Sequence, residues 1–230
     1  MYAERLRETL PAVRERIARA RERAGSGREV ALVAVTKGHP AEAVCAAIDA
    51  GLHEIGENRV HELESKISAL GRAAARWHLI GHLQRNKVRR ALPLFDVLQS
   101  VDSLRLAREL SKEAVRSARR VSMLVQINTS GEASKGGFED RAVDAVARIA
   151  ELEALGVAGL MTMAPLTGDE ATLRGCFAAA RRIFEQCAAR VDGFEPKYLS
   201  MGMSNDFEIA IEEGSTMVRL GTVLFGERER

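Results

Sequence analysis

The chain has 230 residues, of which 46% are hydrophobic and 29% are charged, and its formal net charge is +2 at pH 7. This length suits one large domain or two small ones, and the composition is that of a globular protein with a sizeable core. The near-neutral charge gives no indication of a nucleic-acid partner, and no run approaches the roughly 18 apolar residues of a membrane span.

The first predicted element is an amphipathic helix over residues 1–24. Its apolar residues recur at spacings of three and four, with charged residues between them: Leu6, Leu10, Val13 and Ile17. The segment is dense in Arg and Glu and has no apolar core, so it does not resemble a signal peptide. A small-residue stretch, Ala24–Gly27, ends the pattern.

Beyond this helix, β-rich runs alternate with helical patterns. The expected strands are Val30–Lys37, Glu54–Asn58, Trp77–Gly81, Phe95–Ser100, Val121–Asn128, Val157–Met163, Tyr198–Met203 and Met217–Phe225. The expected helices between them are Ala41–Ala50, Val60–Leu70, Arg85–Leu92, Ser103–Ala118, Ala142–Leu155, Ala171–Ala189 and Asn205–Glu213.

This alternation with short loops indicates parallel βαβ units, and eight strands is the count of a (β/α)8 barrel of the TIM type. A doubly wound sheet is the alternative, although no G-x-G-x-x-G motif is present for its first turn. We therefore predict an α/β fold, with one barrel domain over residues 1–230 and the helix of residues 1–24 packed on it.

Lys37 stands at the end of the first apolar strand. By the period-two alternation of a strand, it shares a face with Ala31, Val33 and Val35. If that face points inward, the amine lies at the mouth of an apolar interior, where desolvation lowers the pKa of a lysine. A neutral amine can attack a carbonyl and form a Schiff base. The alternative is a lysine that caps the strand and extends to water.

Other strand ends supply polar groups to the same mouth. Asn58 follows the second strand, and His82 follows the third. The last two strands carry small and hydroxyl residues: Ser200, Gly202, Ser204, Gly221 and Thr222. In such barrels the loops after strands seven and eight commonly hold a phosphate. A phosphorylated aldehyde could bind to both features, with its aldehyde at the amine of Lys37 and its phosphate at the loops after the last two strands.

Arg219 shares a face of the last strand with Met217 and Gly221. Its guanidinium keeps its charge, so it is suited to bind a phosphate or to donate to a pyridine nitrogen. In the second case it would disfavour protonation of that nitrogen and weaken the ring as an electron sink. The alternative is an ion pair with Glu212 or Glu213.

Four weaker signals are set aside. His78 and His82 are four residues apart but fall on a strand and its following turn, so no metal site is expected. The loop Gly131–Gly137 is glycine-rich without a phosphate-loop motif, so it is interpreted as a flexible loop after the fifth strand. Three cysteines without a C-x-x-C pair favour a reducing cytoplasm. The basic cluster over residues 85–90 is interpreted as a solvated helix face.

Several stretches resemble the YggS/PROSC family of pyridoxal phosphate homeostasis proteins: VAVTKGHP, IGENRVHE, WHLIGHLQRNKVR, QSVDS and Tyr198–Arg228. That family is similar to the N-terminal barrel of alanine racemase, the fold-type III class of proteins that bind pyridoxal 5'-phosphate (PLP). The resemblance implies that Lys37 forms the Schiff base and that Arg219 lies near the pyridine nitrogen. It places Ser200, Gly221 and Thr222 near the phosphate, and Asn58, His82 and Met201 along the pocket.

The resemblance also implies that the protein holds PLP for intracellular PLP homeostasis with little or no turnover, and apo-PLP enzymes are the implied recipients. A PLP-dependent amino-acid racemase, or another PLP enzyme, is the alternative. Racemisation needs two bases, and neither Tyr2 nor Tyr198 is placed to oppose Lys37. The racemase's additional β-domain has no room here, so we expect a monomer. A third possibility is an aldolase-like Lys37 that acts without PLP.

Overall fold

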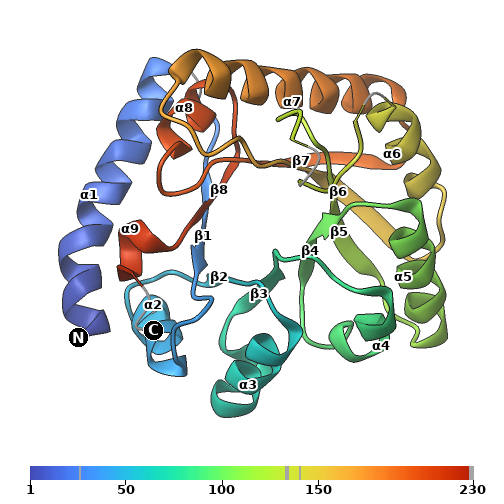
Figure 1. Ribbon diagram of the computed structural model, residues 1–230. Coiled ribbons are helices and arrows are strands. Elements are labelled where there is room, and N and C mark those ends of the chain that lie inside the picture. The colour runs from blue at the N-terminus through green and yellow to red at the C-terminus, as the bar shows by residue number, and fades with distance from the viewer. Residues whose placement is uncertain (26, 133–134, 140, 228–230) are drawn as a thin grey trace.

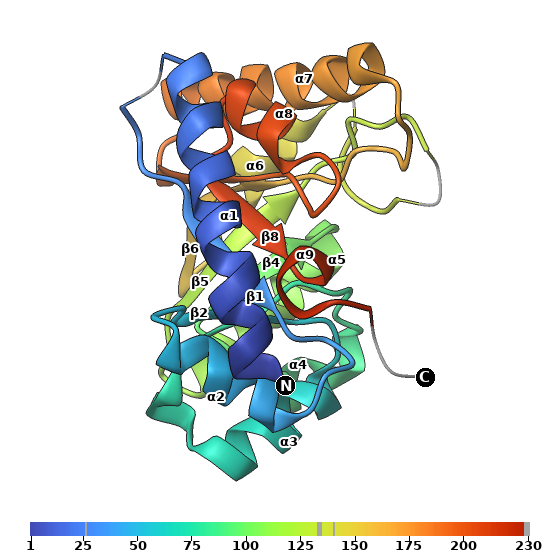
Figure 2. The same cartoon turned by 90° about the vertical axis from the view of Figure 1, so that its left-hand side faces the viewer.

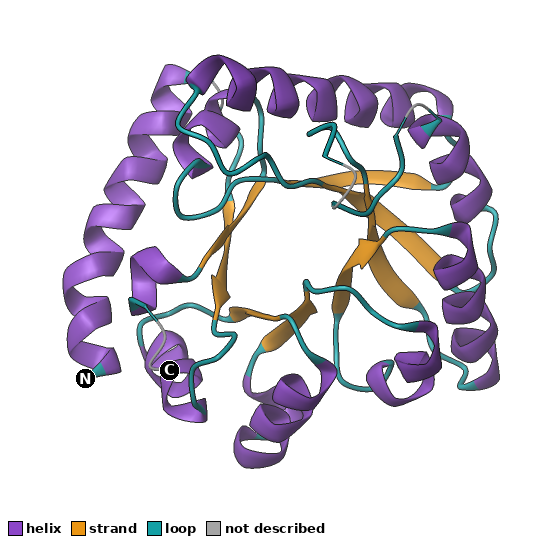
Figure 3. Cartoon of the chain, viewed as in Figure 1, coloured by secondary structure: helices purple, strands orange, loops and turns teal. Residues whose placement is uncertain are grey.

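The structure is a computed structural model that describes residues 1–25, 27–132, 135–139 and 141–227. Within these residues eight parallel strands follow one another in chain order and close into a barrel, with helices around it (Figures 1 and 3). The expected (β/α)8 fold is therefore confirmed, and the doubly wound alternative is wrong because this sheet has no open edge. The single domain over residues 1–230 stays a prediction. Arg228 of the resembling segment and part of the loop Gly131–Gly137 lie outside the described residues.

The strands are β1 (Ala31–Val35), β2 (Glu54–Glu57), β3 (Arg76–Leu79), β4 (Val97–Val101), β5 (Val121–Gln126), β6 (Leu155–Met161), β7 (Phe194–Ser200) and β8 (Met217–Leu220). The α-helices are α1 (Tyr2–Arg23), α2 (Ala41–Asp49), α3 (Val60–Leu70), α4 (Val88–Ala91), α5 (Leu104–Arg116), α6 (Ala142–Ala150), α7 (Glu170–Arg190), α8 (Phe207–Glu212) and α9 (Thr222–Phe225). Two 3-10 turns, Arg72–Ala74 and Arg85–Lys87, precede β3 and α4. Among the described residues, no helix is both long and apolar enough to cross a bilayer.

The N-terminal helix α1 lies along the outer wall of the barrel, beside α8, α9 and α2 (Figures 1 and 2). The predicted apolar stripe is its buried face. Thr9 Oγ1 donates to the carbonyl of Leu224 at 3.0 Å, and Arg16 pairs with Glu208 at 2.6 Å. Because α9 is only a single turn, α1 covers the wall that a full helix after β8 would cover. Residues 1–24 are thus part of the outer helical layer.

The predicted strand Met217–Phe225 is too long. β8 ends at Leu220, and Thr222–Phe225 forms α9. The apolar and β-branched run is read as strand by composition, but the backbone changes direction at Gly221 (φ −121°, ψ −79°). The turn of helix that follows buries Leu224 and Phe225. Burial in this turn therefore accounts for these apolar residues as well as burial in a strand would. Similarly, the predicted helix Ala142–Leu155 ends at Ala150.

The barrel interior is filled by side chains that alternate along the strands. Its apolar part contains Val33, Val97, Leu124, Ala158, Met161, Tyr198 and Met217. Val33 and Met217 share their faces with Lys37 and Arg219 by the alternation of β1 and β8. The face of β1 that carries Ala31, Val33 and Val35 is therefore the inward face, whereas Lys37 follows the end of this strand and its inward orientation stays a prediction.

We expect replacement of Gly159 by alanine to lower the free energy of unfolding by about 3 kcal/mol or more. Gly159 has φ +144°, and an added Cβ would lie 1.8 Å from the carbonyl oxygen of Tyr198 on the neighbouring strand. Gly175→Ala in α7 is the matched control, because nothing lies within 4 Å of its Cβ position. That control should gain about 0.5–1 kcal/mol. Urea unfolding checks both, and equal stability of G159A and the wild type would contradict the expectation.

Candidate functional site

The predicted site residues all lie toward the carboxyl end of the barrel. Lys37, Asn58 and His82 follow β1, β2 and β3, whereas Ser200 is the last residue of β7. In a closed parallel barrel these strand ends form one rim, where loops build active sites. The structure therefore brings together residues that the sequence separates by more than 160 positions.

Lys37 occupies the corner of a tight turn. The backbone N–H of His39 donates to the carbonyl of Thr36 at 3.0 Å, which closes the turn over Lys37 and Gly38. Gly38 has φ +72°, a conformation that favours glycine at this position. Lys37 is half-buried, at the end of the inward-facing series of β1. The lowered pKa of its amine stays a prediction.

Arg219 is the charged group that β8, the strand next to β1, contributes to the site. The register pairs it with Val33 of β1, and only 5% of the residue is exposed. Nη1 donates to the carbonyl and the hydroxyl of Ser200 at 2.9 and 2.7 Å, and Nη2 donates to the carbonyl of Thr162 at 2.9 Å. Burial lowers the pKa of Arg219 to about 10, against the opposing effect of Asp206, so it remains a cation at neutral pH.

The alternative for Arg219, an ion pair with Glu212 or Glu213, is not what the structure contains. Glu212 pairs with Arg23 and Arg174 at 2.5 Å each, and Glu213 pairs with Arg174 at 3.1 Å. Arg219 is therefore held by hydrogen-bond acceptors of the barrel, which leave its positive charge without a bonded carboxylate.

The two turns predicted to hold a phosphate touch each other. The N–H of Val223 donates to Ser204 Oγ at 3.3 Å and so joins the loop after β7 to α9. A Cβ on Gly202 would lie 2.7 Å from the Cβ of Ala210, and one on Gly221 would lie 3.1 Å from the carbonyl oxygen of Val35. These glycines thus allow α8 and β1 to pack closely, a reason that is independent of any phosphate.

Ser200 belongs to a buried polar chain that sequence reasoning missed. Its hydroxyl donates to Gln99 Oε1 at 2.7 Å, and Gln99 Nε2 lies 2.8 Å from His78 Nδ1. Since the amide NH2 can only donate, His78 accepts at Nδ1 and donates from Nε2 to Glu54, with which it is in contact. This chain links Arg219 to Glu54 through the barrel interior. The assignment of Ser200 to the phosphate stays a prediction, because its hydroxyl proton is directed to Gln99.

The electrostatics of Glu54 fit this direction of donation. Burial alone would raise the pKa of its carboxyl, but the hydrogen bond from His78 and the charge of Arg76 hold that pKa below its usual value. His78, considered at first only as a metal ligand, is instead part of this chain. No group of three His, Cys, Asp or Glu side chains suited to a metal occurs among the described residues.

The remaining predicted residues, His82, Asn58 and Met201, differ in their exposure at the carboxyl end of the barrel. His82 is on the rim, with 66% of its side chain exposed, and its Nδ1 lies 2.8 Å from Asp102 Oδ2. Asn58 is half-buried, and its backbone lies close to Gly81. A Cβ added to Gly81 would be 2.2 Å from the carbonyl oxygen of Asn58. Met201 is fully buried, and its N–H donates to the carbonyl of Met217 at 3.1 Å.

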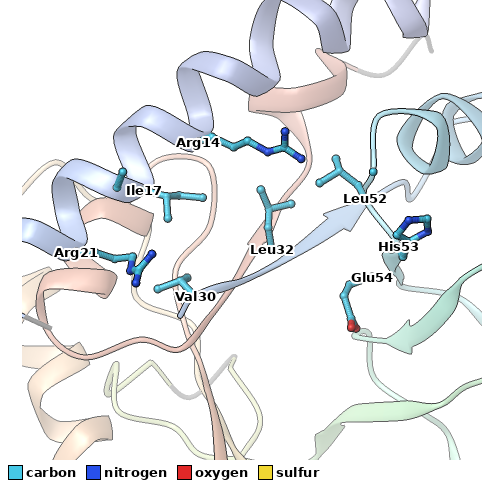
Figure 4. A pocket seen from close by; sticks show the side chains of 10 residues that line it. Arg14, Ile17, Arg21, Val30, Leu32, Leu52, His53 and Glu54 are labelled. Atoms are coloured by element: carbon cyan, nitrogen blue, oxygen red, sulfur yellow. The ribbon is translucent and has the colours of Figure 1, made fainter. Parts of the chain in front are cut away.

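A second cavity lies at the other end of the barrel. It has a volume of about 450 Å³ and lies between α1 and the amino ends of β1 and β2 (Figure 4). Ile17, Val30 and Leu32 line it, with Arg14 and Arg21 pointing toward it (Figure 4). Because Lys37 and the glycine turns follow the opposite ends of the strands, this cavity is separate from the site described above.

Comparison with known proteins gives a consistent result. Residues 9–229 match the family described as alanine racemase, N-terminal domain. A pyridoxal phosphate homeostasis protein of Aquifex aeolicus is 39% identical over 224 residues, which cover 96% of this chain and 98% of that protein. PipY of Synechococcus elongatus, solved with PLP bound, is 34% identical with a TM-score of 0.84, and the match covers 98% of this chain and 100% of that chain.

An alanine racemase of Clostridium difficile has the same fold, with a TM-score of 0.79 at 14% identity. The match covers 99% of this chain but 58% of that chain. The fold likeness therefore extends to the barrel of a larger enzyme, whereas the sequence likeness extends over the whole of the smaller proteins. The chain belongs to the alanine racemase N-terminal domain family and, within it, to the pyridoxal phosphate homeostasis proteins.

Proposed function

We propose that this protein binds PLP at the carboxyl end of the barrel, with Lys37 as the covalent partner, and that it serves PLP homeostasis. When bound, PLP supplies an aldehyde that condenses with an amine and a pyridine ring that withdraws electrons. The observation that carries the proposal is the placement of Lys37 and buried Arg219 on neighbouring strands, beside the two joined glycine turns. The family and the PLP-bound PipY support the choice of ligand.

The residues of the site have distinct roles in this proposal. Lys37 would supply the amine that condenses with the aldehyde of PLP, with loss of water. The turns at Gly202 and Gly221 receive the phosphate, and Arg219 faces the ring nitrogen. Because Arg219 is held as a cation by Ser200 and Thr162, it keeps a charged donor against that nitrogen and disfavours its protonation.

This arrangement favours a carrier over an efficient catalyst. An unprotonated ring is a weak electron sink, so carbanion chemistry on a bound amino acid is slow. A racemase also needs a second base. Tyr198 accepts a hydrogen bond from Arg76 at 3.1 Å, and the hydroxyl of Tyr2 lies 3.2 Å from His39 Nδ1. Both tyrosines therefore have other partners, which supports little or no turnover.

The finer parts of the proposal concern the surroundings of the protein. We propose apo-PLP enzymes as recipients of the cofactor, a monomer as the working form and the cytoplasm as the location. The last rests on the cysteine usage of the sequence, which has three cysteines and no C-x-x-C pair.

We expect purified protein mixed with PLP to turn yellow and to take up PLP stoichiometrically. Borohydride should fix the label on the peptide that contains Lys37. Incubation with L-alanine, followed by chiral chromatography, should give little D-alanine at catalytic protein concentrations. Rapid formation of the D-isomer would support the racemase alternative instead. A protein that stays colourless and unlabelled would overturn the proposal.

A further inference from the structure

A buried charge cluster lies directly beneath the Lys37 turn, on the outer side of the barrel wall. Glu57 of β2 is 0% exposed and Lys66 of α3 is 5% exposed. Both residue types are almost never fully buried unless they are paired, because removing their charges from water is strongly unfavourable. The proposed function has so far used neither side chain.

Lys66 holds the residue that precedes Lys37. Its Nζ donates to the carbonyl of Thr36 at 2.7 Å and to Thr36 Oγ1 at 3.4 Å, and it also bonds to Glu57 Oε1. Thr36 Oγ1 in turn donates to Glu57 Oε1 at 2.5 Å. The three ammonium hydrogens thus match three acceptors, so Lys66 has no hydrogen bond left for a ligand. Its contacts fix the peptide group between Thr36 and Lys37.

Glu62 holds the residue that follows Lys37. The N–H of Gly38 donates to Glu62 Oε2 at 3.0 Å. The carboxyls of Glu62 and Glu57 are themselves in hydrogen-bond contact, and Glu57 Oε2 is buried with no other partner among the described residues. A proton on Glu57, directed at Glu62, satisfies this atom. The two flanks of Lys37 are therefore joined through one network.

The charges around this network shift the pKa values of Glu57 and Glu62 in opposite directions. Burial raises the pKa of Glu57, although Lys66 and Thr36 oppose the rise. Burial also acts to raise the pKa of Glu62, but the Gly38 N–H, Glu57, Lys66 and Arg59 outweigh it and lower that pKa.

We propose that Lys66, Glu57 and Glu62 form a clamp that holds the peptide groups on both sides of Lys37 and thereby fixes the position of its amine. The inference rests on the proposed function, because it concerns how Lys37 meets the aldehyde. The clamp residues are positioning residues that act through the turn. Without them, the turn loses the side-chain contacts to Thr36 and to the N–H of Gly38, and Gly38 gives its backbone wide conformational freedom. Bond formation at Nζ is sensitive to such displacements, since a reacting group misplaced by about 1 Å loses much of its rate.

The test compares two ligands on the double variant Glu57→Gln/Lys66→Met, which removes the carboxyl and the ammonium group with little change of volume. PLP reports covalent capture by its absorbance and by borohydride trapping. Pyridoxine 5'-phosphate has a hydroxymethyl group in place of the aldehyde, so it reports binding without the bond to Lys37. We expect capture of PLP to slow by about ten-fold or more. Affinity for pyridoxine phosphate should stay within about two-fold of the wild type, because its phosphate and ring contacts are unaltered.

Glu64→Gln is the matched control on the same helix, because Glu64 pairs with Arg90 and makes no contact with the turn. It should capture PLP at the wild-type rate. If the double variant does not fold, Glu62→Met removes the contact to Gly38, together with the interactions of Glu62 with Glu57 and Arg59, and should slow capture in the same way. Wild-type capture by the folded variants, or an equal loss of both ligands, would overturn the clamp. Failure of the wild type to bind either ligand would instead overturn the proposed function.

Discussion

Replacement of Lys37 by alanine is expected to abolish borohydride-stable attachment of PLP. The protein should keep a weaker, reversible binding through the glycine turns and Arg219, with the dissociation constant raised by about ten-fold or more. The physical reason is that the bond to the aldehyde requires an amine at the corner of the Thr36–His39 turn, and alanine has none. The measurements are mass spectrometry of the reduced protein and peptide mapping.

Two other lysines test whether the position, and not only the residue type, determines this result. Lys66 is buried and paired as described above, and Lys135 Nζ donates to the carbonyl of Ala164 at 2.6 Å. Neither should take up the label when Lys37 is absent. The exposed Lys112 of α5 gives the control, and K112A should label like the wild type. An unchanged yield of adduct in K37A, carried by a different lysine, would show that the site has been misplaced.

The fold was accessible from the sequence because it follows from local patterns, and the same patterns predict where the site lies. Alternation of apolar runs and helical periods gives the barrel, and parallel strands place residues that end them at one rim. The period of two along β1 also assigns Lys37 to the inward face, and the interior position of Val33 agrees with it. Each of these steps requires only neighbours within about ten residues.

The polar chain between Arg219 and Glu54 could not be predicted without knowing the closed barrel. Gln99 and Ser200 are 101 residues apart, and nothing in either local pattern pairs them. The alternation along each strand could have shown that both side chains face the interior. Which strands lie opposite each other, however, is known only once the barrel is closed. The boundary of β8 was missed for a different reason, because apolar runs of four residues suit a buried strand and a buried helical turn equally well.

The clamp illustrates a second limit. Glu57 and Lys66 are nine residues apart in the chain, and a charged residue in a strand or on a helix is ordinarily assigned to solvent. Their burial follows from the way α3 packs back on β2 after a short loop. A polar residue at an outward strand position, facing a helix, is the signal that would have identified Glu57. It lies directly before Asn58, which was selected from the same strand end.

Replacement of Arg219 by glutamine should produce the largest loss of stability among the site variants. Removal of the guanidinium leaves the carbonyls of Ser200 and Thr162 and the Ser200 hydroxyl without their donor inside the barrel. Buried acceptors that lose a partner cost about 1–3 kcal/mol each, and relaxation reduces the sum, so we expect a loss of about 3–5 kcal/mol. Urea unfolding of the PLP-free protein measures this change. Arg174→Gln is the control, since that side chain is 37% exposed and its ion pairs should contribute only about 1 kcal/mol or less.

Lysine at position 219 separates charge from geometry. It keeps a cation near the pyridine nitrogen, but a point donor cannot serve Ser200 and Thr162 as the planar guanidinium does. Arg219→Lys should therefore lose nearly as much stability as Arg219→Gln, while its spectrum with PLP should stay closer to that of the wild type. Arg219→Gln also removes the charge that disfavours protonation of the ring, so it should racemise alanine faster per bound PLP than the wild type. If it is as inactive as the wild type, Arg219 is not what limits turnover, and the absence of a second base must be sufficient by itself.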